Sequence, residues 1–200
     1  MTISLRPSKR PRAGWGGWRS DRRGSAFVEF GLLTPIYLLV IGGVIDIGRA
    51  ISMEFNLSAG VSAAANFALN QAASAPLTSS NAQTWANNLA NIVASSYSTG
   101  WANATVVVNN SLTASITNGG AISTTGSTTN ANNFYCPTGS VKVGITWGSS
   151  YASAGTSCST GGPVSGQYIV LSATKSFTAL ILPPSIMSNS FTVSAVVQVQ

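Results

Sequence analysis

Few residues in this 200-residue chain could do acid–base or metal chemistry, and most of them lie near its N-terminus. The chain has no histidine. Its four acidic residues are Asp21, Glu29, Asp46 and Glu54. This distribution excludes a histidine-based triad, a histidine–carboxylate metal site, and a pair of catalytic carboxylates beyond residue 54. A serine beside Lys142 or Lys175 could form a nucleophile–base dyad, but a serine-rich chain offers such pairs by chance. We therefore expect a protein that is not an enzyme and has no metal, cofactor or small-molecule substrate.

The positive charge is concentrated in residues 1–24. They hold seven of the ten basic residues against Asp21 alone, which accounts for the whole formal net charge of +6. Prolines and glycines among the arginines, without apolar periodicity, predict a basic leader and not a folded domain. Trp15 and Trp18 would also suit a nucleic-acid-binding arm. The favoured interpretation is that residues 1–24 form the basic flank of a membrane span, because such a flank is held in the cytoplasm. We therefore expect no nucleic-acid partner.

The segment Ala26–Ile45 predicts a transmembrane helix. Its twenty residues carry one charge, Glu29, and twenty residues of α-helix match a hydrocarbon core of roughly 30 Å. Pro35 lies inside it and is tolerated in membrane helices. Asp46 and Arg49 follow where a signal peptide would have small residues for cleavage. Their spacing predicts a simple charge pair at the outer membrane interface.

The remainder predicts a small exported α+β domain. Small apolar residues at helical spacing from Leu57 to Ala72 extend the membrane helix to a point before Pro76. The face they form could pack on the domain or contact a neighbouring subunit. Ser79 to Asn81 offer N-caps for a second helix with an apolar stripe. That stripe comprises Trp85, Leu89, Ile92, Val93 and Tyr97.

Beyond residue 99 the pattern changes to short strands that we expect to pair antiparallel. The predicted strands are 104–108, 112–116, 141–147, 168–182 and 191–199. Two segments rich in Asn, Gly, Ser and Thr, 117–133 and 148–166, predict long surface loops. The expected organisation is thus a leader over 1–24, the long helix over 25–75, and the exported domain over 76–200.

Both cysteines, Cys136 and Cys158, lie in the exported part. An oxidising compartment favours their pairing, and an even count leaves no odd thiol. We expect a disulfide that restrains the 148–166 loop.

The run from Gly24 to Phe30 resembles a type IV prepilin processing site. In that family the peptidase cuts after the glycine, and a glutamate stands fifth in the mature chain, which is Glu29 here. Together with Pro35 and the run Asp46 to Ala50, the segment resembles TadE-like pseudopilins of tight-adherence pilus systems. The closing stretch 168–200 is similar more loosely.

This resemblance implies cleavage between Gly24 and Ser25 by a prepilin peptidase and a role for Glu29 in assembly. It also implies a single-pass protein of the bacterial inner membrane, with a periplasmic domain and other pilins or pseudopilins as partners. Two alternatives stay open: Glu29 as a plain interfacial charge, and the whole chain as an uncleaved, signal-anchored envelope adhesion or binding module.

Overall fold

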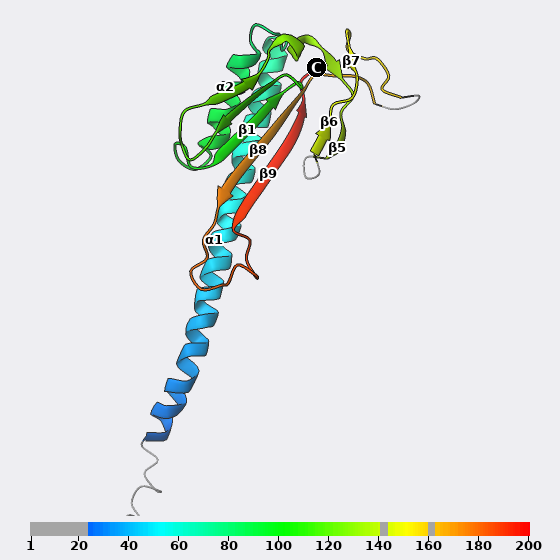
Figure 1. The fold of residues 1–200 in the computed structure, drawn as a ribbon. Coiled ribbons are helices and arrows are strands. Elements are labelled where there is room, and N and C mark those ends of the chain that lie inside the picture. The colour runs from blue at the N-terminus through cyan, green and yellow to red at the C-terminus, as the bar shows by residue number, and fades with distance from the viewer. Residues whose placement is uncertain (1–23, 141–143, 160–162) are drawn as a thin grey trace, which may run out of the picture.

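A long helix carries a small domain at its far end (Figure 1). The computed structural model describes residues 24–140, 144–159 and 163–200, so the predicted basic leader lies outside them apart from Gly24. Helix α1, Ser25–Ser74, has 50 residues, about 75 Å at the usual rise. It includes Pro35 and ends before Pro76, as expected. The structure contains α1, a second helix and an antiparallel sheet, which confirms the predicted α+β class.

The second half of α1 packs into the core of the domain. Leu57, Ala64 and Ala68 are fully buried and Val61 is 3% exposed, whereas Leu69 remains half exposed. Alanines along this stripe let the second helix and the sheet approach the α1 backbone closely. The small-residue face is therefore used mainly for packing within the chain.

Helix α2, Ala82–Ala94, is amphipathic and lies against the sheet. Trp85, Leu89 and Val93 of the predicted stripe are buried, but Tyr97 lies beyond the helix end and is exposed. Asn81 occupies the N-cap position, but its side chain makes no hydrogen bond to the helix. Its side chain instead accepts from the Thr78 N–H at 2.8 Å and donates to the Pro76 carbonyl at 2.9 Å, which fixes the turn between the helices.

The domain contains a five-stranded antiparallel sheet with the order β3-β2-β1-β8-β9. The strands are β1 (Asn103–Val108), β2 (Leu112–Ile116), β3 (Ser123–Gly126), β8 (Tyr168–Ser176) and β9 (Ser190–Gln198). The expected strands near 104–108, 112–116 and 191–199 are confirmed. The loop predicted over 117–133 is wrong in part, because it contains β3 and the short helix η3, Thr129–Asn132. Strand β3 has no apolar alternation to reveal it, since it is an exposed edge of Ser, Thr and Gly.

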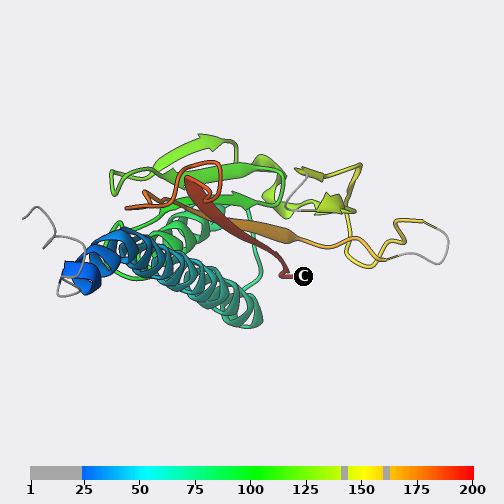
Figure 2. The ribbon, with the colours of Figure 1, turned by 90° about the horizontal axis from the view of Figure 1, so that it is seen from below.

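Both helices cover the same face of this sheet (Figure 2). Helix α1 packs against β8 and β9, and α2 against β1 and β2. Alternate residues of the central strands point to the helices and are buried. These are Ala104, Val106 and Val108 on β1, and Ile169, Leu171 and Ala173 on β8. The result is a two-layer domain whose other sheet face is partly open to solvent.

A lobe of small hairpins lies beside the sheet. Strand β4 (Phe134–Tyr135) pairs with β7 (Ser150–Tyr151), and β5 (Thr138–Ser140) with β6 (Gly144–Thr146). The strand predicted over 141–147 is thus reduced to β6 among the described residues, and the predicted 148–166 loop contains β7. Gly139 and Gly144 have positive φ angles in the close β5–β6 pairing. A pattern of alternating apolar residues does not predict such a turn. The predicted Cys136–Cys158 disulfide is present, with the Cα atoms 5.6 Å apart.

Removing this disulfide should destabilise the lobe selectively. Closing a chain segment of this length contributes roughly 3 kcal/mol in the chain-entropy model. Among the described large apolar residues of the lobe, only Tyr135 is buried, so little apolar packing replaces that restraint. In a Cys136→Ser/Cys158→Ser variant, we expect early loss of amide protection in β4 to β7, with β1 and β8 unchanged. Hydrogen exchange measures this. Free thiols in the freshly isolated wild-type protein would contradict the pairing.

Candidate functional site

The predicted site residues occupy two levels of α1. Gly24, Ser25 and Glu29 lie at its N-terminal end, and Asp46 and Arg49 lie about 26 Å further along at 1.5 Å per residue. The structure therefore does not bring the processing residues and the Asp46–Arg49 pair together.

Gly24 is the N-cap of α1, with an ordinary φ of −89°. A Cβ built at this glycine would meet no atom of the described residues within 4 Å. The fold therefore does not require glycine here. Any requirement for glycine must come from another molecule that recognises this segment.

The N-terminal half of α1 exposes nearly all of its apolar surface. Phe27 is 82% exposed, Phe30 68% and Ile36 57%, and Glu29 is exposed among them. Only 11% of the most apolar 18-residue window of the helix is buried inside the protein. It is the one helix in the described part of the chain that is long and apolar enough to cross a membrane.

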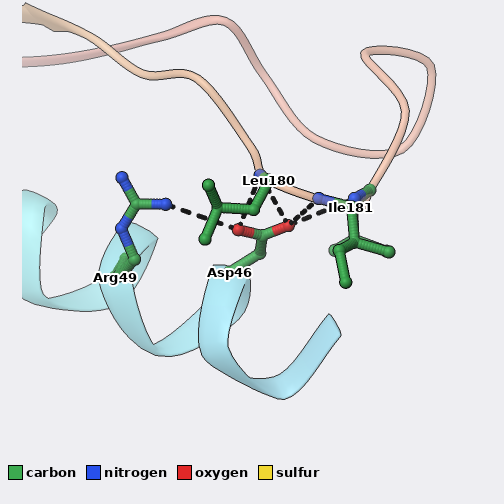
Figure 3. Close-up of polar contacts among 5 residues, drawn as sticks. Asp46, Arg49, Leu180 and Ile181 are labelled. Carbon is green, nitrogen blue, oxygen red and sulfur yellow. Dashed lines mark hydrogen bonds and ion pairs between the residues drawn. The ribbon is translucent and has the colours of Figure 1, made fainter. Parts of the chain in front are cut away.

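Asp46 lies one residue beyond the apolar segment and holds the connection between β8 and β9 (Figure 3). Its carboxylate accepts backbone N–H bonds from Leu180 at 2.9 and 3.0 Å, from Ile181 at 2.9 Å and from Leu182 at 3.1 Å. The side chain is completely shielded from solvent. The predicted Asp46–Arg49 pair is present, but the expectation that it is a simple pair is wrong, because the carboxylate also anchors a loop 134 residues away in sequence.

Arg49 completes this arrangement. Its Nη1 lies 3.5 Å from Asp46 Oδ1, and its guanidinium lies 5.5 Å from the centre of the Phe177 ring. Hydrogen bonds from Leu180 above all, then from Ile181, hold the pKa of Asp46 below its ordinary value. The carboxylate is thus the form that binds the loop, and successive N–H groups directed at one anion form the kind of nest that favours negative charge.

A glycine notch in α1 receives the same loop. Gly42 and Gly43 are buried, and with Asp46 and Ala50 they form one covered face of an otherwise exposed stretch. A Cβ at Gly42 would overlap Cδ1 of Ile181, whereas a Cβ at Gly43 would make an ordinary 3.8 Å contact with Leu182. Gly42 therefore provides the space that Ile181 fills.

The sequence predicts a wide loop at Pro183–Pro184 but places its start too late, because the strand predicted over 168–182 ends six residues earlier, at Ser176. The available signals were loss of alternation after Ser176 and the doubled Pro183–Pro184, which cannot continue a sheet ladder.

A second group of side chains lies near Arg49. Lys175 donates through Nζ to the Trp101 carbonyl and lies 5.3 Å from the centre of the Trp101 ring. The rings of Tyr97 and Trp101 are 5.8 Å apart. Tyr97 and Trp101 line an open groove with the α1 segment from Ile45 to Asn56, so cationic and aromatic side chains lie beside the helix just above the apolar segment.

The described residues contain no group of three or more His, Cys, Asp or Glu side chains that could hold a metal ion. Glu54, the remaining acid on α1, lies in an exposed position beside a shallow apolar groove that includes Ile51 and Val193.

Comparison with known proteins identifies the N-terminal segment. No curated protein and no solved structure matches the chain. Residues 24–66 match the family model described as TadE-like protein, which covers 43 of the 200 residues. The match begins at Gly24 and includes Glu29, Pro35, Asp46 and Arg49. Over residues 24–66 the chain is therefore TadE-like, a finding consistent with a protein of tight-adherence pilus systems.

Proposed function

We propose that this protein is a membrane-anchored pseudopilin, or minor pilin, that takes part in assembling a tight-adherence type IV pilus. The observation that carries the proposal is the difference in exposure between the two halves of α1, the helix that contains most of the TadE-like segment. Its first half exposes apolar side chains on nearly all sides, and its second half is packed into a small domain. Such a helix can be held in a bilayer before assembly and can pack against neighbouring helices afterwards.

The proposed topology follows from charge. The basic leader precedes the apolar segment, which favours a cytoplasmic N-terminus in the bacterial inner membrane and a periplasmic domain. The disulfide suits that oxidising compartment. In this proposal the protein acts through assembly and not through catalysis, and its partners are membrane lipid, a prepilin peptidase, and other pilins or pseudopilins.

The alternative function is an envelope adhesion or binding module that keeps its N-terminal segment as an uncleaved anchor. The exposed Ser-, Thr- and Asn-rich surface of the domain suits this alternative equally well. The two differ in the mass of the mature protein, because only the pseudopilin loses residues 1–24.

Gly24→Val should block processing. Intact mass spectrometry of membranes from peptidase-positive cells should show wild-type protein that begins at Ser25, and a variant that keeps all 200 residues. The folded chain has room for a side chain at Gly24, so retention of the leader would report recognition by the peptidase. Gly31→Val is a matched control, because a Cβ at Gly31 also meets no atom within 4 Å. It should be processed normally.

A wild-type mass that includes residues 1–24 would contradict the pseudopilin proposal and favour the uncleaved anchor. Normal processing of Gly24→Val would contradict the assignment of the cleavage site.

A further inference from the structure

The connection between β8 and β9 lies beside the apolar segment of α1. Ile181 reaches Gly42, which is three residues, or about 4.5 Å along the axis, inside the segment that ends at Ile45. Leu182 contacts the next residue, Gly43. Figure 1 shows this connection in orange, extending from the sheet along α1 toward the N-terminal half of the helix. If α1 spans a membrane, part of this loop is at the depth of the bilayer.

The surface of this connection is apolar and uncharged. Leu180 and Ile186 are each 71% exposed, and Ile181 is 49% exposed. The sequence has no charged residue from Phe177 to the C-terminus. Three large apolar side chains exposed on one short loop are unfavourable in water and mark a surface that contacts another apolar phase.

The N–H groups of the loop are also suited to an apolar environment. Irregular backbone is normally excluded from hydrocarbon because its N–H and C=O groups have no partners. Here the three N–H groups of residues 180–182 donate to Asp46, and Pro183 and Pro184 have none. The N–H groups of Ile186 and Met187 both donate to the Pro183 carbonyl. Seven of the eight positions from 180 to 187 thus have a bonded N–H or lack one.

Side chains typical of a membrane–water boundary lie near the base of the loop. Trp101 and Tyr97 lie beside α1 at Ile45 to Asn56, and Lys175 lies over the Trp101 ring. Arg49 lies over Phe177, where the loop begins. Aromatic rings and long cationic side chains concentrate at the headgroup level of membrane proteins.

We propose that residues 179–187 insert into the outer boundary of the lipid bilayer, between headgroups and acyl chains. In this arrangement Asp46 serves as the hydrogen-bond acceptor that makes the loop backbone compatible with that environment. The lipid contact would fix the domain close to the membrane and limit its rotation about α1. The inference depends on the proposed membrane anchor, and its test separates the two.

Depth-dependent fluorescence quenching tests the insertion. The full-length protein, with its native disulfide intact, is reconstituted in phosphatidylcholine vesicles that contain lipids with a quencher at a shallow or a deep acyl position. Single cysteines at three exposed sites carry an environment-sensitive label: Ile186→Cys in the loop, Ile36→Cys in the apolar helix, and Ser74→Cys at the end of α1. The third site lies about 42 Å beyond Asp46 along the helix.

We expect the Ile36 label to be quenched most by deep quenchers, the Ile186 label most by shallow ones, and the Ser74 label by neither. Quenching at Ile36 without quenching at Ile186 would overturn the insertion while leaving the membrane anchor intact. An Ile186 label that is shielded from water but not quenched by lipid would likewise overturn it, in favour of coverage by a second copy of the chain. Absence of quenching at Ile36 would contradict the membrane anchor itself, and with it the insertion.

Discussion

Asp46→Ala should release the connection between β8 and β9 from α1. The substitution removes the acceptor of three successive backbone N–H groups at once, at a position that is fully buried. Amides at Leu180 to Leu182 should then exchange on the order of ten- to hundredfold faster, while the sheet keeps its protection. Hydrogen exchange on the purified protein in detergent measures both regions in one experiment. Arg49 should lose its ordered position over Phe177 as well.

Two variants calibrate this result. Asp46→Asn keeps one side-chain oxygen but loses the charge and the second oxygen, so its exchange should be intermediate. Glu54→Ala removes an exposed acid from the same helix and should leave the loop protected. Wild-type protection of Leu180 to Leu182 in Asp46→Ala would show that other contacts hold the loop, with Ile181 in the Gly42 notch as the leading one.

The elements with strong local periodicity could be predicted from the sequence. The continuous helical spacing of apolar residues gave α1 to within a residue or two of its end at Ser74. Short β-rich runs predicted β1 and β2, and apolar alternation predicted β9, because each strand has a face that packs toward the helices.

The role of Asp46 could not be predicted in this way. Its partners are backbone N–H groups, which nearly every residue type provides, so no residue pattern in 180–182 identifies them. The i, i+3 spacing to Arg49 gave only the local ion pair. Recognising the anchor required the path of the chain after β8, and the missed end of that strand at Ser176 concealed it.

Buried polar residues in turns were missed for a similar reason. Asn109 is fully buried at a positive φ of 48°, and its amide donates to the Ala131 and Asn133 carbonyls while its oxygen accepts from the Tyr168 N–H. It joins η3 to the sheet. In sequence it is one asparagine among many, because its environment depends on segments more than twenty residues away.

The processing and assembly residues remain predictions that the structure makes testable. Gly24 has no steric role in the fold, and Glu29 lies on an exposed part of α1. Substitutions at both positions therefore leave the packed domain untouched, and an effect on processing or assembly would not be a secondary effect of misfolding.

Glu29→Ala should abolish most assembly while leaving membrane insertion and cleavage intact. Cleavage after Gly24 would create a new amine at Ser25, and in a stack of parallel helices that amine can approach Glu29 of the next subunit. Desolvating either charge alone is costly, so the pair favours one register of docking over others. Removing one partner of a buried ion pair costs about 3–5 kcal/mol, which corresponds to roughly a hundredfold or more in association.

Co-purification with other pilus subunits and surface piliation measure this loss, at matched protein levels and with the mature mass verified. Glu29→Asp, one methylene shorter, should be intermediate because the charge remains but its reach decreases. Glu54→Ala makes the same change in net charge outside the apolar segment and should assemble normally. Wild-type piliation and subunit binding by Glu29→Ala would remove the assembly role and leave Glu29 as an interfacial charge, whereas failed insertion would assign its effect to a step before assembly.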